Sequence, residues 1–502
     1  MGIFNPKKPL KILFIATEAA PFAKVGGLGS VMYSLPKALG EIGYDVRLMM
    51  PRYLSIDDNI HHLKIEYKEL KVPTDNENGP ETLICNVKRS DPSTDSKAVI
   101  TYFLENQEYY EQRANVYGYA DDPIRWALLC RGTLEFLKQS NSWIPDVIVS
   151  SDWQTGLVPN YLKTVYAKDP VLSRIATVFS IHNLCYQAMY DHHFVSDMDF
   201  DDGHSSIPGF NNPRLYKLNL MRRGIIYSDA INTVSPNYAR EIMTKDFGEL
   251  LDELLRERRA VLTGILNGID YTLWDPESDP HIPFHYTSHD LEDRAKNKKA
   301  LQERFGLEIK KDTFLVSIVN RLNKQKGLDI LFPIMDLLLQ ELPLQLIVVG
   351  GGDSDIMNFF HDLETRFPGK VAVHLKFDPI LPHIVFAGSD ITLVPSRFEP
   401  CGLVQMEAMR MGCIPIVRKT GGLADSVEDY NPEKNTGTGF IFEKFDSSSI
   451  MISLIRAFEN FRDKKKWADL QKRAMAKDFS WDSSALKYTE LFNRSIELHK
   501  RI

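Results

Sequence analysis

The chain has 502 residues, which is too many for one hydrophobic core and therefore predicts two large domains. Hydrophobic residues make up 43% of it and charged residues 25%, a composition that is typical of folded globular proteins and excludes a disordered or fibrous chain. The net charge is −7, and Lys and Arg are spread along the sequence, so no basic segment is present to bind a nucleic acid.

No apolar stretch reaches the roughly eighteen residues that a membrane-spanning helix needs, so we expect no membrane partner. The segment "MGIFNPKKPLKILFIATEAAP" superficially resembles a secretion signal, but its apolar run is short and ends at Thr17 and Glu18. We interpret residues 10–17 as a first strand. The five cysteines are an odd number without the spacing of a metal site, which favours a reducing compartment and predicts a cytoplasmic protein.

Short apolar runs rich in Val and Ile alternate with longer helical patterns in both halves of the chain. The first half contains "KILFIAT", "YDVRLMM", "DVIVSSD", "IATVFSIHN" and "AINTVSP", and the second contains "TFLVSIVNR", "LQLIVVGGG", "VAVHLKF", "ITLVPS" and "IPIVRKT". Strands that are apolar on both faces and separated by helices predict parallel sheets covered by helices. The sequence therefore predicts an α/β fold with two Rossmann-like parallel-sheet domains.

The segment 264–290 is dense in Gly, Pro, Asp and His and is the candidate linker between the domains. We place the first domain at residues 1–265 and the second at 266–480. The last stretch, about 481–502, is a helical pattern with no strand after it, and we expect it to pack back on the first domain. Residues 55–100 are polar and rich in Gly and Pro, which predicts an excursion from the first sheet.

Open parallel sheets bind ligands beyond the carboxyl ends of their strands, so the loops that follow strands are informative. The first of them is "KVGGLG", residues 24–29, in which glycines let the backbone approach a ligand, helix N–H groups point at an anion, and Lys24 adds a positive charge. Gly26, Gly27 and Gly29 do not form G-x-G-x-x-G, and no G-K-S/T occurs, which argues against a dinucleotide site and a P-loop. Taken alone, the loop is equally well explained as a tight turn with an exposed lysine.

Two further strand ends carry polar groups. "DVIVSSDWQTGL" places Asp152 and Trp153 after one strand, and "TVFSIHNLCYQ" places His182 and Asn183 after the next. A lone His or Asp is more often a structural residue than a catalyst. Ligand-capable groups at several separate strand ends, in this half and in the second, are harder to explain in that way, so together they predict a site.

In the second half, "NRLNKQKGLDIL" places Arg321 and Lys326 at a strand end and a helix start. A lysine there opposes the helix dipole, so the position requires a compensating anion, for which a pyrophosphate is the natural candidate. Each cation at about 4 Å from a phosphate would contribute on the order of 4 kcal/mol at an effective dielectric constant near ~20. The alternative is a surface Arg and Lys without a partner.

The most specific stretch is "ITLVPSRFEPCGLVQMEAMRMG". Glu399 lies in its loop, Pro400 prepares a helix start, Gly402 and Leu403 offer free N–H groups, and Glu407 follows two turns later. Carboxylates suit sugar hydroxyls because they accept hydrogen bonds with defined geometry. The stretch predicts a sugar held at the helix start, and the alternative is that both glutamates only cap or decorate the helix.

Taken together, these loops resemble the bacterial glycogen synthases and plant starch synthases, glycosyltransferase family 5. The matching strings run in family order across nearly the whole chain: "KVGGLGSV", "SDWQTGLVP", "SIHNLCYQ", "INTVSPNYAREI", "GILNGIDYTLWDP", "NRLNKQKGLDIL", "PSRFEPCGLVQMEAMRMG", and "TGGLADSVEDY" followed by "GTGFIF". The resemblance implies the GT-B fold, in which the two domains face a central cleft. It implies retaining transfer of glucose from a nucleotide diphosphate glucose, usually ADP-glucose, to the non-reducing end of an α-1,4-glucan such as glycogen or a maltooligosaccharide primer.

The resemblance also carries over site residues, motif by motif. The positions that it marks as catalytic are Lys24, Asp152, His182, Arg321, Lys326 and Glu399. The positions that it marks as donor-binding are Lys24, Gly26, Gly27, Asn183, Arg321, Lys326, Cys401, Gly402, Leu403 and Glu407. Neither a metal nor another cofactor is expected, because the sequence has no H-E-x-x-H motif and no cysteine cluster.

On the donor side, the resemblance implies that Arg321 and Lys326 neutralise the departing diphosphate and that Lys24 approaches the phosphates and the glucose. Glu399 would hold glucose hydroxyls, and Glu407 would reach the ribose. Stabilising the diphosphate would let the glycosidic bond loosen towards an oxocarbenium-like state, and retention would follow from attack on the same face.

On the acceptor side, Asp152 and His182 would line the reacting centre. The chain departs from the family pattern at Ser30, where Asp is usual, and at Ser151, where His is common. These departures bear on acceptor choice and rate more than on donor chemistry. Two alternatives stay open: another retaining GT-B transferase that uses UDP-glucose or a different acceptor, and a catalytically silent glucan-binding relative.

Overall fold

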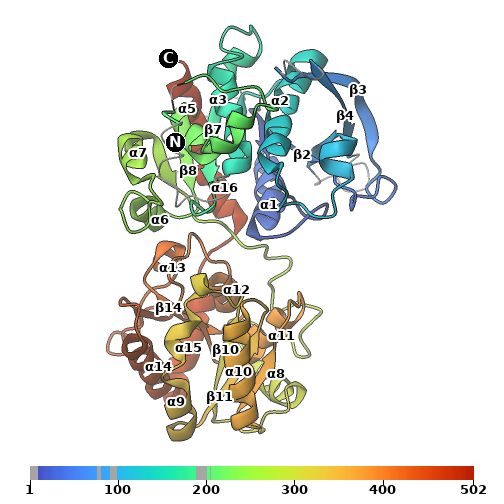
Figure 1. Ribbon diagram of the computed structural model, residues 1–502. Helices are drawn as coiled ribbons and strands as arrows, with labels where there is room; N and C mark the ends of the chain where they lie inside the picture. Colours follow the sequence, from blue (N-terminus) through green and yellow to red (C-terminus); the bar gives the residue numbers. More distant parts are fainter. Residues whose placement is uncertain (1–8, 76–80, 91–98, 188–200, 204, 502) are drawn as a thin grey trace. The chain divides into compact units, whose positions relative to one another are not determined.

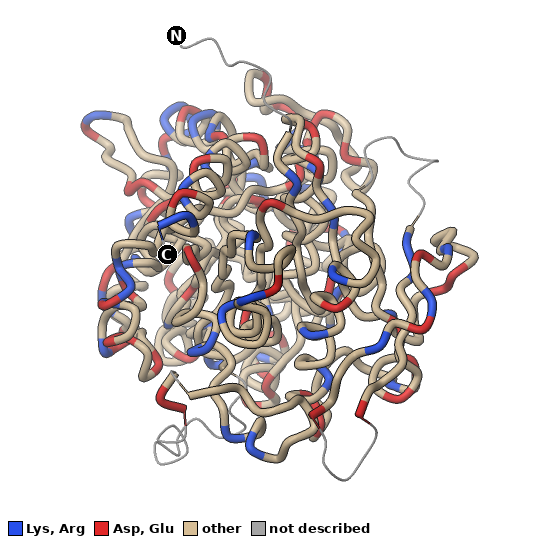
Figure 2. Tube along the Cα trace, turned by 90° about the horizontal axis from the view of Figure 1, so that it is seen from above, with Lys and Arg blue, Asp and Glu red and all other residues tan. Residues whose placement is uncertain are grey.

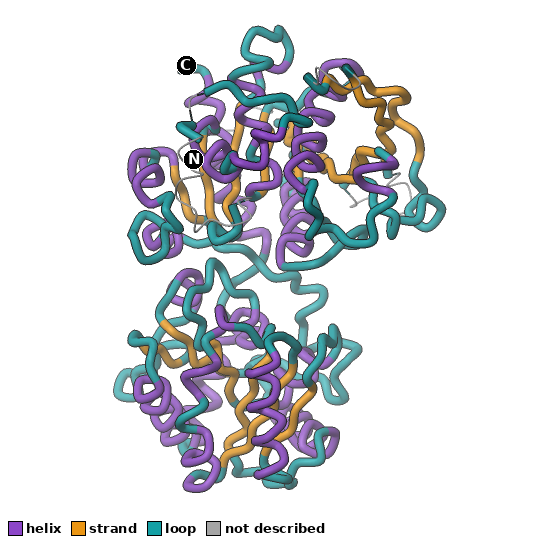
Figure 3. Tube along the Cα trace, in the orientation of Figure 1, coloured by secondary structure: helices purple, strands orange, loops and turns teal. Residues whose placement is uncertain are grey.

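The computed structural model describes residues 9–75, 81–90, 99–187, 201–203 and 205–501 (Figure 1). Within them the chain forms two compact units, each considered by itself. Unit 1 contains the chain up to Val234, Ala239–Ile265 and the C-terminal segment from Trp481, and unit 2 contains Ser235–Tyr238 and Leu266–Ser480. In both units helices lie beside the central strands (Figure 3).

Among the described residues, unit 1 is built on a nine-stranded sheet in the order β3-β4-β5-β2-β1-β6-β7-β8-β9. The strands are β1 (Lys11–Ile15), β2 (Asp45–Pro51), β3 (Lys64–Pro73), β4 (Thr82–Arg89), β5 (Ile100–Glu105), β6 (Val147–Ser151), β7 (Ala176–Ile181), β8 (Ala230–Thr233) and β9 (Leu262–Gly264). From β5 to β9 all neighbours pair in parallel, and β1, β6 and β7 are buried over almost their whole length. This confirms the predicted parallel sheet, whose apolar strands need helices on both faces.

The predicted excursion from the sheet over residues 55–100 is wrong for most of its length. β3 and β4 form an antiparallel hairpin, and β4 pairs with β5, so the hairpin extends the sheet at one edge. β3 has register shifts beside Tyr67 and a left-handed φ of 54° at Glu69. An edge strand has one covered face and therefore contains many polar residues. Because the register of β3 is also irregular, its sequence lacks the regular apolar alternation that identifies a strand.

The helices of unit 1 are α1 (Gly27–Glu41), α2 (Asp122–Ser140), α3 (Leu157–Lys163), α5 (Leu220–Tyr227), α7 (Asp252–Glu257) and α16 (Trp481–His499), and α6 (Pro236–Glu241) lies at the boundary of the units. Helix α16 packs against α1, β7 and β8, and the Tyr488 hydroxyl accepts a hydrogen bond from Asn232 at 3.1 Å. Ser235–Tyr238, which the sequence assigns to the first domain, group instead with unit 2. The reason is local, because the N–H of Asn237 donates to the Asp425 carboxylate at 2.7 Å.

Unit 2 contains a six-stranded sheet in the order β12-β11-β10-β13-β14-β15, in which every neighbouring pair is parallel. The strands are β10 (Phe314–Val319), β11 (Leu344–Val349), β12 (Val371–His374), β13 (Ile391–Val394), β14 (Ile414–Arg418) and β15 (Phe440–Phe442). The helices are α8 (Glu292–Arg304), α9 (Met335–Glu341), α10 (Ser354–Arg366), α11 (Leu381–Gly388), α12 (Val404–Arg410), α13 (Gly421–Ser426), α14 (Ser447–Phe461) and α15 (Lys464–Met475). The strand order is that of the Rossmann fold, which confirms the predicted fold class.

Each sheet has a point at which the strand order reverses direction. In unit 2 it lies between β10 and β13, and in unit 1 it lies between β1 and β6. The loops that leave the carboxyl ends of two such strands run in opposite directions, so they diverge and open a crevice for a ligand. The loops after these four strands are therefore the candidate ligand-binding segments. The central cleft between the domains stays a prediction.

Charged residues of both signs are interspersed along the trace (Figure 2). Within the described ranges, none of the helices combines the length and the apolar character that crossing a membrane requires.

Candidate functional site

The loops after β10 and β13 meet in unit 2 through a buried ion pair. The Nζ atom of Lys326 lies 2.5 Å from Oε2 of Glu399, and the two residues are only 8% and 6% exposed. The Ser396 hydroxyl donates to the same oxygen at 2.9 Å. A buried cation and a buried carboxylate thus stand side by side at the point where the strand order reverses.

The backbone of the two loops holds this pair in register. The N–H of Arg397 donates to the carbonyl of Gln325 at 2.8 Å, which ties the two loops together. Gly327 has a left-handed φ of 65°, and a Cβ atom there would lie 2.3 Å from the carbonyl oxygen of Pro395. Glycine is therefore required for the turn that carries Lys326 to approach the β13 loop so closely.

Arg321 lies in the same loop as Lys326 but in a different environment. It is exposed, its N–H donates to the side chain of Asn320 at 3.1 Å, and its guanidinium has no carboxylate partner in the part of the chain that the structure describes. An exposed, unpaired guanidinium beside a buried ion pair is free to bind an anion in a bidentate manner.

The loop that carries Glu399 is covered by the glycines of "TGGLADS". The N–H of Gly422 donates to the carbonyl oxygens of Glu399 and Pro400, both at 3.1 Å. A Cβ atom on Gly421 would lie 1.8 Å from the carbonyl oxygen of Glu399. From the sequence, "TGGLADS" is only one of the strings that carry the family resemblance. The structure shows that its glycines contact the backbone of the Glu399 loop.

The remaining positions that the sequence predicts to bind the donor in this segment follow Glu399 in the chain. The amides of Gly402 and Leu403 have no acceptor among the described residues, and Glu407 lies in the middle of α12. Cys401 is buried, and burial raises the pKa of its thiol to about 12. The thiol is therefore protonated at neutral pH and is a poor nucleophile.

In unit 1 the structure brings Asp152, His182 and Asn183 together. Oδ1 of Asp152 accepts the N–H groups of His182 at 2.7 Å and Asn183 at 3.3 Å, so this carboxylate holds the end of β7. Desolvation raises the pKa of Asp152 to about 7, although both amides act in the opposite direction. Asp152 also has a left-handed φ of 57°, which is uncommon for a residue with a Cβ atom and typical of functional sites.

His182 is neutral at physiological pH. Burial lowers the pKa of its imidazole to about 4, and its Nε2 atom is buried without a hydrogen-bond partner in the described ranges. A neutral ring with one unsatisfied nitrogen can donate to or accept from a polar ligand without bringing a positive charge to it.

In the loop after β1, two amides have an acceptor from the chain itself. The sequence predicts that the N–H groups of the helix after this loop point at an anion, and that prediction concerns α1 from Gly27 onward. Just before the helix, the N–H groups of Val25 and Gly26 donate to Oε2 of Glu18 at 2.6 and 2.9 Å. An anion from the chain itself therefore occupies this position. Gly27 begins α1, and Lys24 is exposed, with no carboxylate partner for its ammonium group among the described residues.

The two departures from the family pattern have different surroundings. Ser30 lies in the first turn of α1 and is partly buried. Ser151 is buried at the end of β6, and its hydroxyl contacts Sδ of Met32 on α1 at 3.8 Å. Ser151 therefore serves the packing of a helix on the sheet.

Sequence reasoning missed two residues that follow strands, Glu18 after β1 and Phe377 after β12. From the sequence, Glu18 marks only the end of a strand, and the signal for its role is a carboxylate six residues before the glycine-rich loop at residues 24–29. Phe377 is 85% exposed and follows β12. Its neighbour Lys376 lies close to Gly351, because a Cβ atom on that glycine would be 3.5 Å from the Lys376 Cα atom. A strongly exposed aromatic ring at the carboxyl edge of a Rossmann sheet is a flat surface on which a planar ligand can stack.

No group of three or more His, Cys, Asp and Glu side chains that could hold a metal ion occurs within the ranges the structure describes. The polar groups of both units are amides, carboxylates, an imidazole and three cationic side chains, a set suited to phosphate and hydroxyl ligands.

Comparisons with known proteins match both halves of the chain. Residues 11–257 match the starch synthase catalytic domain, and residues 300–474 match the glycosyl transferases group 1 family. A glycogen synthase from Thermotoga petrophila is 41% identical over 495 residues, which cover 97% of this chain and 99% of that protein.

Solved structures give the same result for the fold. The catalytic domain of starch synthase IV from Arabidopsis thaliana, bound to ADP and acarbose, has a TM-score of 0.84 and 32% identity, and covers 97% of this chain and 100% of that chain. Sucrose-phosphate synthase from Thermosynechococcus elongatus has a TM-score of 0.58 and 18% identity, with coverage of 96% and 98%, and is similar in fold alone.

Proposed function

Because this chain belongs to the glycogen and starch synthase family of glycosyltransferases, we propose that it elongates an α-1,4-glucan, with ADP-glucose as donor and glycogen or a maltooligosaccharide as acceptor. The reaction breaks the bond between the glucose C1 atom and the diphosphate, and it forms a bond from C1 to an acceptor hydroxyl oxygen with retention of configuration. The hydroxyl proton leaves with the diphosphate. All five cysteines are free, which supports a cytoplasmic location.

The observation that carries this proposal is the pair of Lys326 and Glu399. In a nucleotide sugar the anionic phosphate and the sugar hydroxyls lie within a few ångströms of each other, so a site must present a cation and a hydroxyl acceptor at a similar spacing. The pair places Nζ and Oε2 at 2.5 Å, with both groups already desolvated. Desolvated charges interact more strongly with a ligand than exposed ones because water screens them less.

Arg321 and two amides add further anion-binding groups to the loops that carry Lys326 and Glu399. The exposed Arg321 guanidinium can follow the diphosphate as its charge develops, and the amides of Gly402 and Leu403 supply further donors. Preorganised donors of this kind lower the barrier because they need little reorganisation as the leaving group departs. Lys24, which is exposed, is a further candidate contact for the donor phosphates.

The unit 1 residues suit a positively charged transition state. An oxocarbenium-like centre would be repelled by an imidazolium, and the depressed pKa of His182 keeps this ring neutral. Asp152 orders the backbone at His182 and Asn183 through its two accepted hydrogen bonds. We assign Asp152 the role of orienting this loop for the sugar.

Phe377 is the candidate contact for the nucleobase. Its ring is 85% exposed, and it follows the strand next to the loop Gly350–Gly352 of unit 2. Stacking on an aromatic ring tolerates more than one base, so Phe377 alone does not select ADP over UDP.

The test is a donor comparison. The purified protein is incubated with ADP-glucose or with UDP-glucose, each with glycogen or maltoheptaose, and chain growth is followed together with nucleotide release. We expect growth from ADP-glucose, and the new linkages should be cleaved by an α-1,4-specific hydrolase. Growth from UDP-glucose only would contradict the donor assignment, and growth from neither donor would favour a silent glucan-binding relative.

A further inference from the structure

Glu18 is a buried carboxylate with an unusual set of partners. It is 4% exposed and follows β1, and its Oε2 atom accepts the N–H groups of Val25 at 2.6 Å and Gly26 at 2.9 Å. A Cβ atom on Gly29 would lie 3.1 Å from the same oxygen and 3.2 Å from the Cα atom of Lys24. The carboxylate therefore lies inside the turn that carries Lys24, and the turn is wrapped around it.

A second side chain fixes the carboxylate from the opposite side. The hydroxyl of Tyr117 donates to Oε1 of Glu18 at 3.1 Å and lies 2.7 Å from Oγ1 of Thr17. Burial raises the pKa of the Tyr117 phenol well above its ordinary value, so the hydroxyl stays protonated and remains a donor. Each oxygen of Glu18 thus has its own partners, which restrict the rotation of the carboxylate.

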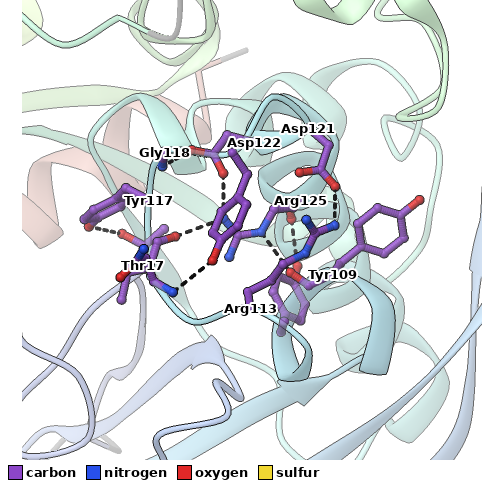
Figure 4. Close-up of polar contacts among 12 residues, drawn as sticks. Thr17, Tyr109, Arg113, Tyr117, Gly118, Asp121, Asp122 and Arg125 are labelled. Carbon is purple, nitrogen blue, oxygen red and sulfur yellow. Dashed lines mark hydrogen bonds and ion pairs between the residues drawn. The ribbon is translucent and has the colours of Figure 1, made fainter.

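The segment that bears Tyr117 is itself anchored by a buried arginine (Figure 4). Arg125 on α2 is completely buried, and its guanidinium donates to the carbonyl of Tyr109 at 2.8 Å, the carbonyl of Val116 at 2.9 Å and the Asp122 carboxylate at 2.5 Å. Asp122 in turn accepts the N–H of Gly118 at 2.9 Å. Hydrogen bonds thus anchor the backbone on both sides of Tyr117, whose hydroxyl holds Glu18.

This arrangement separates the role of the loop backbone from that of the lysine. Two of the amides near the start of α1 are already satisfied by Glu18, so they cannot also bind a phosphate without displacing it. Lys24 is left as the exposed cation of the turn. Its ammonium group can act on a substrate with a defined geometry only if the turn below it is held in one conformation.

We propose that Glu18 is a positioning residue: by accepting the Val25 and Gly26 amides while Tyr117 holds it, it fixes the turn from which Lys24 reaches the donor. The inference rests on the proposed function only for the identity of the donor, because amide exchange in the turn can be measured without any substrate.

Glu18→Gln and Glu18→Ala distinguish this role from others. In the glutamine variant the side-chain oxygen can still accept both amides, and its NH2 group can donate to the Tyr117 hydroxyl, which donates onward to Thr17. This variant keeps the turn and loses only the charge, whereas alanine loses all three hydrogen bonds. Tyr53→Phe is a matched control, because it removes a buried hydrogen bond to the Thr17 carbonyl, 2.7 Å long, without touching the carboxylate.

The first measurement is amide hydrogen exchange of the full-length protein in the absence of substrate. We expect residues 24–29 to exchange at least about tenfold faster in Glu18→Ala than in the wild type, to remain protected in Glu18→Gln, and to be unchanged in Tyr53→Phe. Equal exchange in the wild type and Glu18→Ala would overturn the proposal.

The second measurement is glucosyl transfer at saturating donor. Misplacing a substrate-directed group by about 1 Å costs on the order of a hundredfold in rate, so Glu18→Ala should lower kcat by about 10- to 100-fold and Glu18→Gln should recover most of it. A glutamine variant as slow as alanine would also overturn the proposal, because it would assign the effect to the charge. Absence of transfer by the wild type from either donor refutes the proposed function, and the exchange result then decides the role of Glu18.

Discussion

The buried pair of Lys326 and Glu399 allows its catalytic and structural contributions to be separated. Lys326→Ala removes a cation that we assign to the diphosphate, and the loss of one such contact reduces turnover by about a hundredfold, or roughly 3 kcal/mol. The same change leaves Glu399, which is only 6% exposed, with the Ser396 hydroxyl as its remaining described partner. Breaking a buried pair in this way costs about 3–5 kcal/mol of stability.

Lys326→Ala is therefore expected to lower stability as well as turnover. The double variant Lys326→Ala/Glu399→Gln separates the two effects, because it removes the charge that Lys326→Ala leaves unpaired. We expect urea denaturation to show most of the lost stability restored in the double variant, whereas turnover with saturating ADP-glucose and glycogen remains at least about a hundredfold below that of the wild type.

Two results would refute this reasoning. Wild-type turnover in Lys326→Ala would show that the lysine is not a leaving-group contact. Turnover that returns together with stability in the double variant would show that Lys326 acts only by pairing with Glu399.

Three further predictions follow from the same geometry. Arg321→Ala should lower kcat by about a hundredfold without a change in urea stability, because its exposed guanidinium pairs with no described carboxylate, and wild-type kcat would contradict its assignment to the diphosphate. Asp152 has a pKa raised to about 7, so the folded state retains a proton that the unfolded state has lost, and the stability of the wild type relative to Asp152→Asn should fall as pH rises from about 4 to about 7. A pH-independent difference in urea stability would show that the Asp152 carboxyl is not desolvated. Phe377→Ala should raise the donor KM by about tenfold, as expected from roughly 1–3 kcal/mol of base stacking, with unchanged stability, and an unchanged KM would exclude base stacking.

The loops of unit 2 were the part of the candidate site most accessible to sequence reasoning. Arg321, Lys326 and Glu399 lie directly after strands whose apolar runs are continuous and easy to recognise. That the two loops touch depends on β10 and β13 being neighbours, although β11 and β12 come between them in the chain. The hydrophobic pattern contains no information on that order, so the pairing of Lys326 with Glu399 could not be derived from it.

The glycine-rich loop of unit 1 shows the opposite case, in which the motif was visible and the partner of the Val25 and Gly26 amides was not. The spacing of Gly26, Gly27 and Gly29 correctly marked a turn before a helix. The partner of its amides is a carboxylate from the preceding strand end, which is held by a tyrosine 99 residues further along. A glycine motif shows that the backbone can approach something closely, and it does not show what the backbone approaches.

By itself the sequence determined the α/β class, the parallel strands and the positions of polar groups after them, because these depend on local apolar patterns and on residues that interrupt them. Tertiary structure alone decided which of those groups meet. Three features illustrate this: the edge hairpin of β3 and β4, the buried Lys326–Glu399 pair, and the hydrogen bonds from the Lys24 turn to Glu18. Each of them joins segments that are distant in the chain or irregular in pattern. Such contacts arise from the strand order and from burial, and both are properties of the folded chain as a whole.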